Sequence, residues 1–178
     1  MGVVLQDSSH GGRTPYEAFT VYLIGAVSVL ADQFVKFAIV TILTLGQSRP
    51  IVDGLFGLRY VQNFGVAFSM FWGAGGFLLL PAIAISLAIV VYQWRVRRTE
   101  PLVVAALGLI LGGALGNLID RATLGYVRDM FDLQWQGRNI FPIFNVADVS
   151  VNLGVGLFAL QYMLQGRKPA KAPVRADS

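Results

Sequence analysis

The stretch GGALGNLIDR, residues 112–121, decides the fold, and the shorter stretch NVAD at residues 145–148 repeats its Asn-x-x-Asp pattern. If both segments are helical, each Asn shares a face with its Asp, because side chains three residues apart are neighbours on a helix. Both copies lie at the edge of a long apolar run, where an ionised carboxylate is costly and usually functional. We therefore predict that Asp120 and Asp148 meet at a membrane surface as a catalytic pair.

The composition around these stretches is that of an integral membrane protein. Of the 178 residues, 55% are hydrophobic and only 13% are charged, and the mean hydropathy is +0.62, whereas about 25% of the residues in a soluble domain are charged. The chain has no cysteine, which excludes disulfides and thiolate chemistry. Its single histidine, His10, lies in a polar leader, so neither a histidine zinc site nor a Ser-His-Asp triad can be assembled. We expect no metal and no cofactor.

Four apolar runs are long enough to cross a bilayer, which takes about 20 residues. The sequence predicts a mainly α, polytopic membrane protein, with one four-helix domain over residues 17–165. Residues 1–16 read as a disordered leader, and residues 166–178 form a basic tail. In the third run, glycines recur every four residues on one face and allow another helix to approach closely. The predicted spans are residues 19–45, 75–94, 101–119 and 144–164, and the glycines are Gly108, Gly112 and Gly116.

Two segments between the runs are extramembrane. Residues 46–73 contain short β-prone pieces interrupted by Pro and Gly, so we predict a few short strands there. Asn63-Phe64-Gly65 within it is typical of a turn. Residues 121–142 are polar and aromatic, with Gly and Pro as breakers, and are predicted to form an external loop.

The distribution of cations predicts the topology. With both termini and the 95–100 loop on one side, that side carries eight cations and the other carries five, so the positive-inside rule places both termini in the cytoplasm. The net charge of +4 is then a topology signal and does not indicate nucleic-acid binding. The eight are Arg13, Arg95, Arg97, Arg98, Arg167, Lys168, Lys171 and Arg175, and the five are Arg49, Arg59, Arg121, Arg128 and Arg138.

This topology brings polar residues to one depth. Residues 101–119 span about 28 Å at about 1.5 Å per residue, which carries Asp120 to the external interface. The last span returns inward, so Asp148 lies at nearly the same level. Asp32 and Lys36 fall in the outer half of the first span, in the order that favours an i, i+4 ion pair. Asn63, in the first external loop, can fold onto the same region.

Two neighbouring aspartates cannot both ionise cheaply, so the pair shares a proton. One carboxylate can deprotonate a water molecule while its protonated partner donates to the scissile carbonyl and then to the leaving amine. Peptide hydrolysis needs both roles and no metal, and the sequence leaves open which aspartate is the base. Asn117 and Asn145 are predicted to hold carboxylates or substrate amides, and Arg121 to balance negative charge.

Five separated motifs, in order, resemble those of lipoprotein signal peptidase (signal peptidase II), a bacterial membrane aspartic protease family. The resemblance covers about residues 28–160, and Val66 departs from it, because a small residue such as Ala is expected there. The motifs are Asp32-Gln33-x-x-Lys36, Asn63-x-Gly65-x-Ala67-Phe68, Gly116-Asn117-x-x-Asp120-Arg121, Gly125-x-Val127-x-Asp129 and Phe144-Asn145-x-Ala147-Asp148.

The resemblance implies four transmembrane helices, an external β-cradle from residues 46–73, and a mobile periplasmic helix and loop in the second external segment. It implies a monomer in the bacterial inner membrane, with the active site on the periplasmic face, that cleaves diacylglyceryl-modified prolipoproteins on the amino side of the lipidated cysteine. It also implies a dyad of Asp120 and Asp148. Residues expected to surround the dyad, or to contact substrate and the antibiotic globomycin, are Asp32, Lys36, Asn63, Gly65, Asn117, Arg121 and Asn145.

Three other functions stay open on the sequence. A proton-coupled transporter would use Asp32, Lys36, Asp120 and Asp148 as a relay, but it predicts ionisable residues through the full membrane depth. A non-catalytic assembly subunit would dock through the glycine face of the third span. A serine protease would pair Ser69 with Lys36, although Lys36 is more simply explained by its pairing with Asp32.

Overall fold

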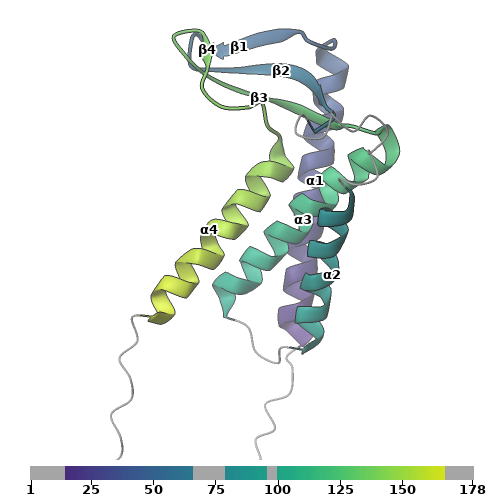
Figure 1. The fold of residues 1–178 in the computed structure, drawn as a ribbon, viewed down its shortest axis with the longest axis vertical. Coiled ribbons are helices and arrows are strands. Elements are labelled where there is room, and N and C mark those ends of the chain that lie inside the picture. The colour runs from purple at the N-terminus through teal and green to yellow at the C-terminus, as the bar shows by residue number, and fades with distance from the viewer. Residues whose placement is uncertain (1–14, 66–78, 96–99, 167–178) are drawn as a thin grey trace, which may run out of the picture.

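Four helices stand side by side beneath a small sheet in the computed structural model, which describes residues 15–65, 79–95 and 100–166 (Figure 1). Three of the described helices, α1, α3 and α4, are long and apolar enough to cross a membrane, and α2 is a shorter apolar helix. The prediction of a mainly helical, multi-pass membrane protein is confirmed. The helices are α1 (Pro15–Ile42), α2 (Leu79–Arg95), α3 (Pro101–Leu124) and α4 (Val146–Gly166).

Helix α3 is the central helix because it contacts each of the other three. Its glycine face lies against α1: a Cβ added at Gly108 would lie 2.7 Å from Ile24 Cβ, and one at Gly112 would lie 2.5 Å from Ser28 Cβ. This confirms the close approach predicted from the glycine spacing. Gly113 makes an equally close approach to the first turn of α4, where an added Cβ would collide with the Ala147 carbonyl oxygen. The two helices that deliver polar residues are therefore fixed to α3 at backbone-to-backbone distance.

The extramembrane sheet draws on both segments between the helices. Its order is β1-β2-β3-β4, and all of its strand pairs are antiparallel. The first segment forms β1 and β2, as expected for residues 46–65; residues 66–73 of that prediction lie outside the described part. The strands are β1 (Ser48–Val52), β2 (Phe56–Asn63), β3 (Val127–Trp135) and β4 (Arg138–Asn139).

The second segment differs from the predicted external loop and helix. Helix α3 continues to Leu124 and ends at Gly125, which adopts the left-handed conformation at φ 80°. The chain then enters β3, which pairs with β2 from Asn63↔Val127 to Phe56↔Leu133. A strand forms there because β2 would otherwise present an unpaired row of backbone N–H and C=O groups. That pairing partner is 64 residues away in the chain, so the local sequence does not show it.

The sheet lies across the ends of α1 and α3 (Figure 1) and is fixed there by a small apolar core. Ile39 and Leu43, at the end of α1, pack with Tyr60 of β2 and Met130 of β3. This packing places the first half of β3 directly beside the polar residues of α1 and α3.

The contact at Gly113 gives a stability test. Gly113→Ala is expected to lower the free energy of unfolding by about 1–3 kcal/mol, the usual cost of overpacking, because its Cβ meets backbone of α4 that cannot move aside. Gly156→Ala in α4 is the matched control, since an added Cβ there has no neighbour within 4 Å. Thermal unfolding in detergent measures both. An unchanged Tm for Gly113→Ala would contradict the close approach of α3 and α4.

Candidate active site

A buried cluster of four charged side chains joins α1, α3 and β3. Lys36 Nζ lies 2.8 Å from Asp32 Oδ2 and 3.3 Å from Asp120 Oδ2, and all three side chains are fully buried. Arg128 of β3 reaches the same carboxylate, with its Nη2 2.7 Å from Asp120 Oδ1. The predicted ion pair of Asp32 and Lys36 is therefore present, but it belongs to a larger cluster with two cations and two carboxylates.

Side chains of α1 and α3 link Asp120 to Asp148 in the structure. Asp120 is enclosed by donors: the backbone N–H of Arg128 at 2.9 Å, the guanidinium of the same residue, and the amide of Gln33 at 3.2 Å. Lys36 and Asn117 lie between the two aspartates, since Lys36 Nζ donates to Asn117 Oδ1 at 2.9 Å and Asn117 Nδ2 donates to Asp148 Oδ1 at 2.8 Å. Asp120 is thus a fully ion-paired carboxylate that anchors β3.

Asp148 and Asn145 begin helix α4 as a reciprocal cap. The Asp148 N–H donates to Asn145 Oδ1 at 2.9 Å, and the Asn145 N–H donates to Asp148 Oδ2 at 3.2 Å. Asp32 satisfies a further free donor of this helix end, because the Ala147 N–H donates to its Oδ1 at 2.9 Å. The positive end of α4 therefore stabilises two carboxylates, of which only Asp148 is partly exposed.

Asp129 of β3 is hydrogen-bonded to this cap through Asn145. Asn145 Nδ2 donates to Asp129 Oδ1 at 2.6 Å, and Asn63 Nδ2 donates to Asp129 Oδ2 at 2.9 Å. Burial raises the pKa of Asp129 to about 6; the hydrogen bond from Asn63 lowers it, and the charge of Asp148 raises it further. The charge of Asp148 therefore acts on Asp129, and Asn145 donates to both carboxyl groups: its side-chain amide to Asp129 and its backbone N–H to Asp148.

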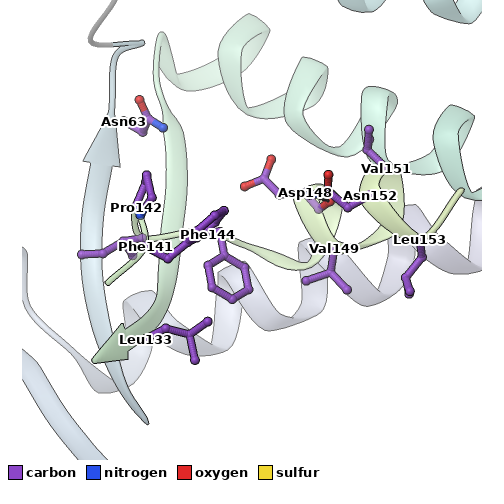
Figure 2. Close-up of a pocket in the computed structure, with 11 residues that line it drawn as sticks. Asn63, Leu133, Phe141, Pro142, Phe144, Asp148, Val149, Val151, Asn152 and Leu153 are labelled. Atoms are coloured by element: carbon purple, nitrogen blue, oxygen red, sulfur yellow. Dashed lines mark hydrogen bonds between the residues drawn. The ribbon is translucent and has the colours of Figure 1, made fainter. Parts of the chain in front are cut away.

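Two adjoining cavities open beside these aspartates. The larger, of about 650 Å³, is lined by Asp148, and the smaller, of about 350 Å³, is lined by Asp129. Asn63, Pro142 and Ile143 line both cavities and so form the wall between them. Figure 2 shows the Asp148 carboxylate pointing from α4 toward the strands, with Phe144 and Leu133 beneath it. Each of the two aspartates thus lines one of two cavities that share three lining residues.

The other predicted site residues fall into two groups. Asn63, Asn117 and Asn145 are brought together around the aspartates, and Gly65 completes the predicted turn: its N–H donates to Asn63 Oδ1 at 2.8 Å, and its φ is +77°. Arg121 lies half-buried on the last turn of α3, and the guanidinium that contacts Asp120 is that of Arg128. Val66, the departure from the family pattern, lies outside the described residues.

Sequence reasoning missed the positions of Arg128 and Asp129. The signal was the alternation Val127-x-Asp129 after Gly125, which is typical of a strand with Val127 and Asp129 on one face. Among residues 15–65, 79–95 and 100–166, no group of three or more His, Cys, Asp or Glu side chains could hold a metal ion. What the site contains is a coupled carboxyl pair beside two cavities, an arrangement suited to general acid and base catalysis on water.

Comparison with known proteins gives consistent matches. A family model described as signal peptidase (SPase) II matches residues 24–164. The lipoprotein signal peptidase of Brevibacillus brevis is 39% identical over 147 residues, which cover 83% of this chain and 97% of that protein. That of Bacillus subtilis is 39% identical over 150 residues, covering 84% and 97%. A bacterial membrane enzyme solved by the in meso method at 2.3 Å resolution superposes with a TM-score of 0.73 at 31% identity, covering 86% of this chain and 94% of that one.

The buried cluster predicts a large effect of removing one cation. Lys36→Met leaves Arg128 as the remaining cation of the cluster, and Asp32 loses its ion-pair partner. The free energy of unfolding is therefore expected to fall by about 3–5 kcal/mol. The double variant Asp32→Asn, Lys36→Met should recover part of this loss. Arg138→Met, at an exposed cation of β4, is the control and should unfold like the wild type. Equal Tm values for Lys36→Met and Arg138→Met would contradict the cluster.

The raised pKa of Asp129 predicts how its substitution acts at different pH values. Its carboxyl has a pKa of about 6 in the folded chain against a reference value of 3.8, so the folded state holds the proton more tightly. The contribution of Asp129 to stability is then greatest below about pH 4 and is lost as the pH rises to about 6, a loss of up to about 3 kcal/mol. The Tm of Asp129→Asn minus that of the wild type should therefore increase between pH 4 and pH 7. Asp53→Asn, which removes an exposed carboxylate from a turn, is the matched control.

Proposed function

Because this chain belongs to the signal peptidase II family, an aspartic peptidase family, we propose that it removes the signal peptide from diacylglyceryl-modified prolipoproteins by activating water between Asp129 and Asp148. Cleavage is on the amino side of the lipidated cysteine. The observation that carries this proposal is that one residue, Asn145, donates to both carboxyl groups, through its side-chain amide to Asp129 and through its backbone N–H to Asp148. The two aspartates interact electrostatically, and each lines one of two cavities that share wall residues.

The two carboxyl groups have environments that separate their roles. Asp129 is 2% exposed and its raised pKa favours the protonated form, so it acts as the acid. Asp148 is partly exposed at the positive end of α4, so it is the carboxylate that takes a proton from water. The water oxygen attacks the scissile carbonyl carbon while Asp129 donates its proton to the carbonyl oxygen. When the C–N bond breaks, the proton held by Asp148 passes to the leaving amine, and one hydroxyl of the tetrahedral intermediate returns a proton to Asp129.

In this proposal Asp120 is a positioning residue and not the partner of Asp148. It accepts hydrogen bonds from both the backbone and the guanidinium of Arg128, the residue that precedes Asp129 in β3. Its two carboxylate oxygens are occupied by cations and amides, which leaves no oxygen free to activate water. Asp120 therefore holds β3 against the end of α3, and this position of β3 places Asp129 in contact with Asn145.

The larger cavity suits a lipid-bearing substrate. Its wall is mostly apolar. The lining residues come from β3, from the loop between β4 and α4, and from the first turns of α4. Acyl chains of the diacylglyceryl group would gain about 0.8 kcal/mol per buried CH₂. Globomycin-type inhibitors are proposed to occupy the same space. The lining residues on the apolar wall are Leu133, Phe141, Pro142, Ile143, Phe144, Val149, Val151 and Leu153.

The proposed setting is the bacterial inner membrane, with both termini cytoplasmic and the sheet at the periplasmic face. The excess of cations on the terminal side supports this orientation. A monomer is sufficient, because all proposed catalytic and supporting residues come from one chain. Family membership gives no support to the proton-coupled transporter considered from the sequence.

The decisive experiment compares three isosteric variants on a diacylglyceryl-modified prolipoprotein in detergent, below the Tm of each. Asp129→Asn and Asp148→Asn should each lower kcat by at least about 100-fold with folding intact, because each removes a proton-transfer group. Asp120→Asn should lower the Tm yet retain far more activity per folded molecule. If Asp120→Asn is inactive while folded and Asp129→Asn cleaves normally, the dyad is Asp120 with Asp148, as first predicted from the sequence.

A further inference from the structure

We propose that the tips of the two β-hairpins insert into the membrane leaflet next to the sheet and hold the sheet against the bilayer surface. The tips meet at one end of the sheet, where Figure 1 shows the turn between β1 and β2 beside β4. The Gln134 N–H donates to the Leu55 carbonyl at 2.8 Å and joins them. We define the hairpin-tip patch as Ile51, Val52, Leu55, Trp135 and Ile140.

The hairpin-tip patch is far more apolar than a water-facing turn needs to be. Its five side chains are between 46% and 62% exposed, and they come from two chain segments about 80 residues apart. Scattered apolar side chains are normal on a surface, but a contiguous group of this kind marks a contact with a membrane or a partner. Trp135 is 61% exposed, and Trp is the residue most typical of the membrane–water interface.

The spanning helices of this chain argue that the occupant is lipid, because they place the sheet close to a bilayer. Phe37, Ile42 and Leu45 are each more than half exposed and carry the apolar surface of this spanning helix up to its end. The chain then enters β1 at Ser48, and β1 leads from α1 to the other end of the sheet, beside β4 (Figure 1). The sheet lies crosswise on the helix ends (Figure 1), so its tip extends over the bilayer beside the bundle and not away from it.

The charges around the patch fit lipid headgroups. Arg49 of β1 and Arg138 of β4 are both exposed beside it, and Asp53 contributes one carboxylate, for a local charge of +1. An Arg at this depth can lay its aliphatic part on acyl chains and direct its guanidinium to a phosphate. This combination of apolar tip and cationic flank matches an interface that has both acyl chains and phosphates.

Insertion of the tip has a consequence for the larger cavity. Phe141 follows Ile140 of the patch, is 52% exposed, and also lines the cavity of about 650 Å³. A seated tip would therefore place the mouth of this cavity against the acyl-chain region. This consequence rests on the proposed function; the membrane contact itself does not.

The test measures the depth of Trp135 directly, without any activity assay. The full chain with Trp72→Phe and Trp94→Phe keeps Trp135 as its single Trp, and it is reconstituted into phosphatidylcholine vesicles that contain brominated phosphatidylcholine. Emission of Trp135 should be quenched most by bromines near the headgroup end of the acyl chain and little by acrylamide in water. A chain that keeps only Trp94, which is 75% exposed on α2, is the lipid-contact control.

A second variant tests the patch as a unit. Ile51→Ser with Ile140→Ser, in the chain with Trp135 alone, should reduce bromine quenching and shift the emission to the red, while the Tm in detergent stays unchanged because both side chains are more than half exposed. Strong acrylamide quenching of Trp135 with no bromine quenching would overturn the proposal in favour of a water-facing tip. Quenching by neither reagent would overturn it in favour of a protein partner.

Discussion

Burying two carboxylates inside an apolar helix bundle is the constraint on which this structure depends. Asp32 and Asp120 are fully buried, and each would cost several kcal/mol without a partner. Lys36 lies between them, and Arg128 closes the cluster from β3. Since these groups belong to α1, α3 and the sheet, satisfying the charges also fixes the three elements relative to one another, so an electrostatic requirement determines the position of the strand.

Asparagine amides connect this cluster to the partly exposed aspartate without adding charge. Asn117 accepts from Lys36 and donates to Asp148, and Asn145 accepts from the Asp148 N–H and donates to Asp129. An amide offers both a donor and an acceptor, so it can bridge two charged groups that have different tasks. The acidic residues therefore fall into two kinds. Asp32 and Asp120 are paired with cations, whereas Asp129 accepts hydrogen bonds from two neutral amides.

That division explains why two acidic residues nine positions apart behave differently. Asp120 contacts Arg128 and Lys36, whereas burial raises the pKa of Asp129 to about 6. A carboxyl group with a pKa near neutrality can keep a proton and release it during a reaction, while an ion-paired carboxylate cannot. The sheet therefore does more than cover the helix ends, because it carries the buried carboxyl group with the raised pKa.

The amino-acid sequence by itself determined the membrane class, the four apolar helices, the glycine contact of α3 with α1, and the ion pair of Asp32 with Lys36. These follow from hydropathy and from spacings of three or four residues, which are local and therefore readable along the chain. It also placed Asn63, Asn117, Asn145 and Asp148 near one another, because antiparallel spans return the chain to the same depth.

Only the tertiary structure brings Asp129 of β3 to Asn145, at the start of α4. The pattern Asn-x-x-Asp predicted Asp120, since the copy at residues 145–148 has the same form. The pairing of β2 with β3 depends on hydrogen bonds between strands 64 residues apart in the chain, and this pairing turns Arg128 toward Asp120 and places Asp129 on Asn145. Which carboxylate is neutralised and which stays coupled to Asp148 is set by these long-range contacts, and no local spacing encodes them.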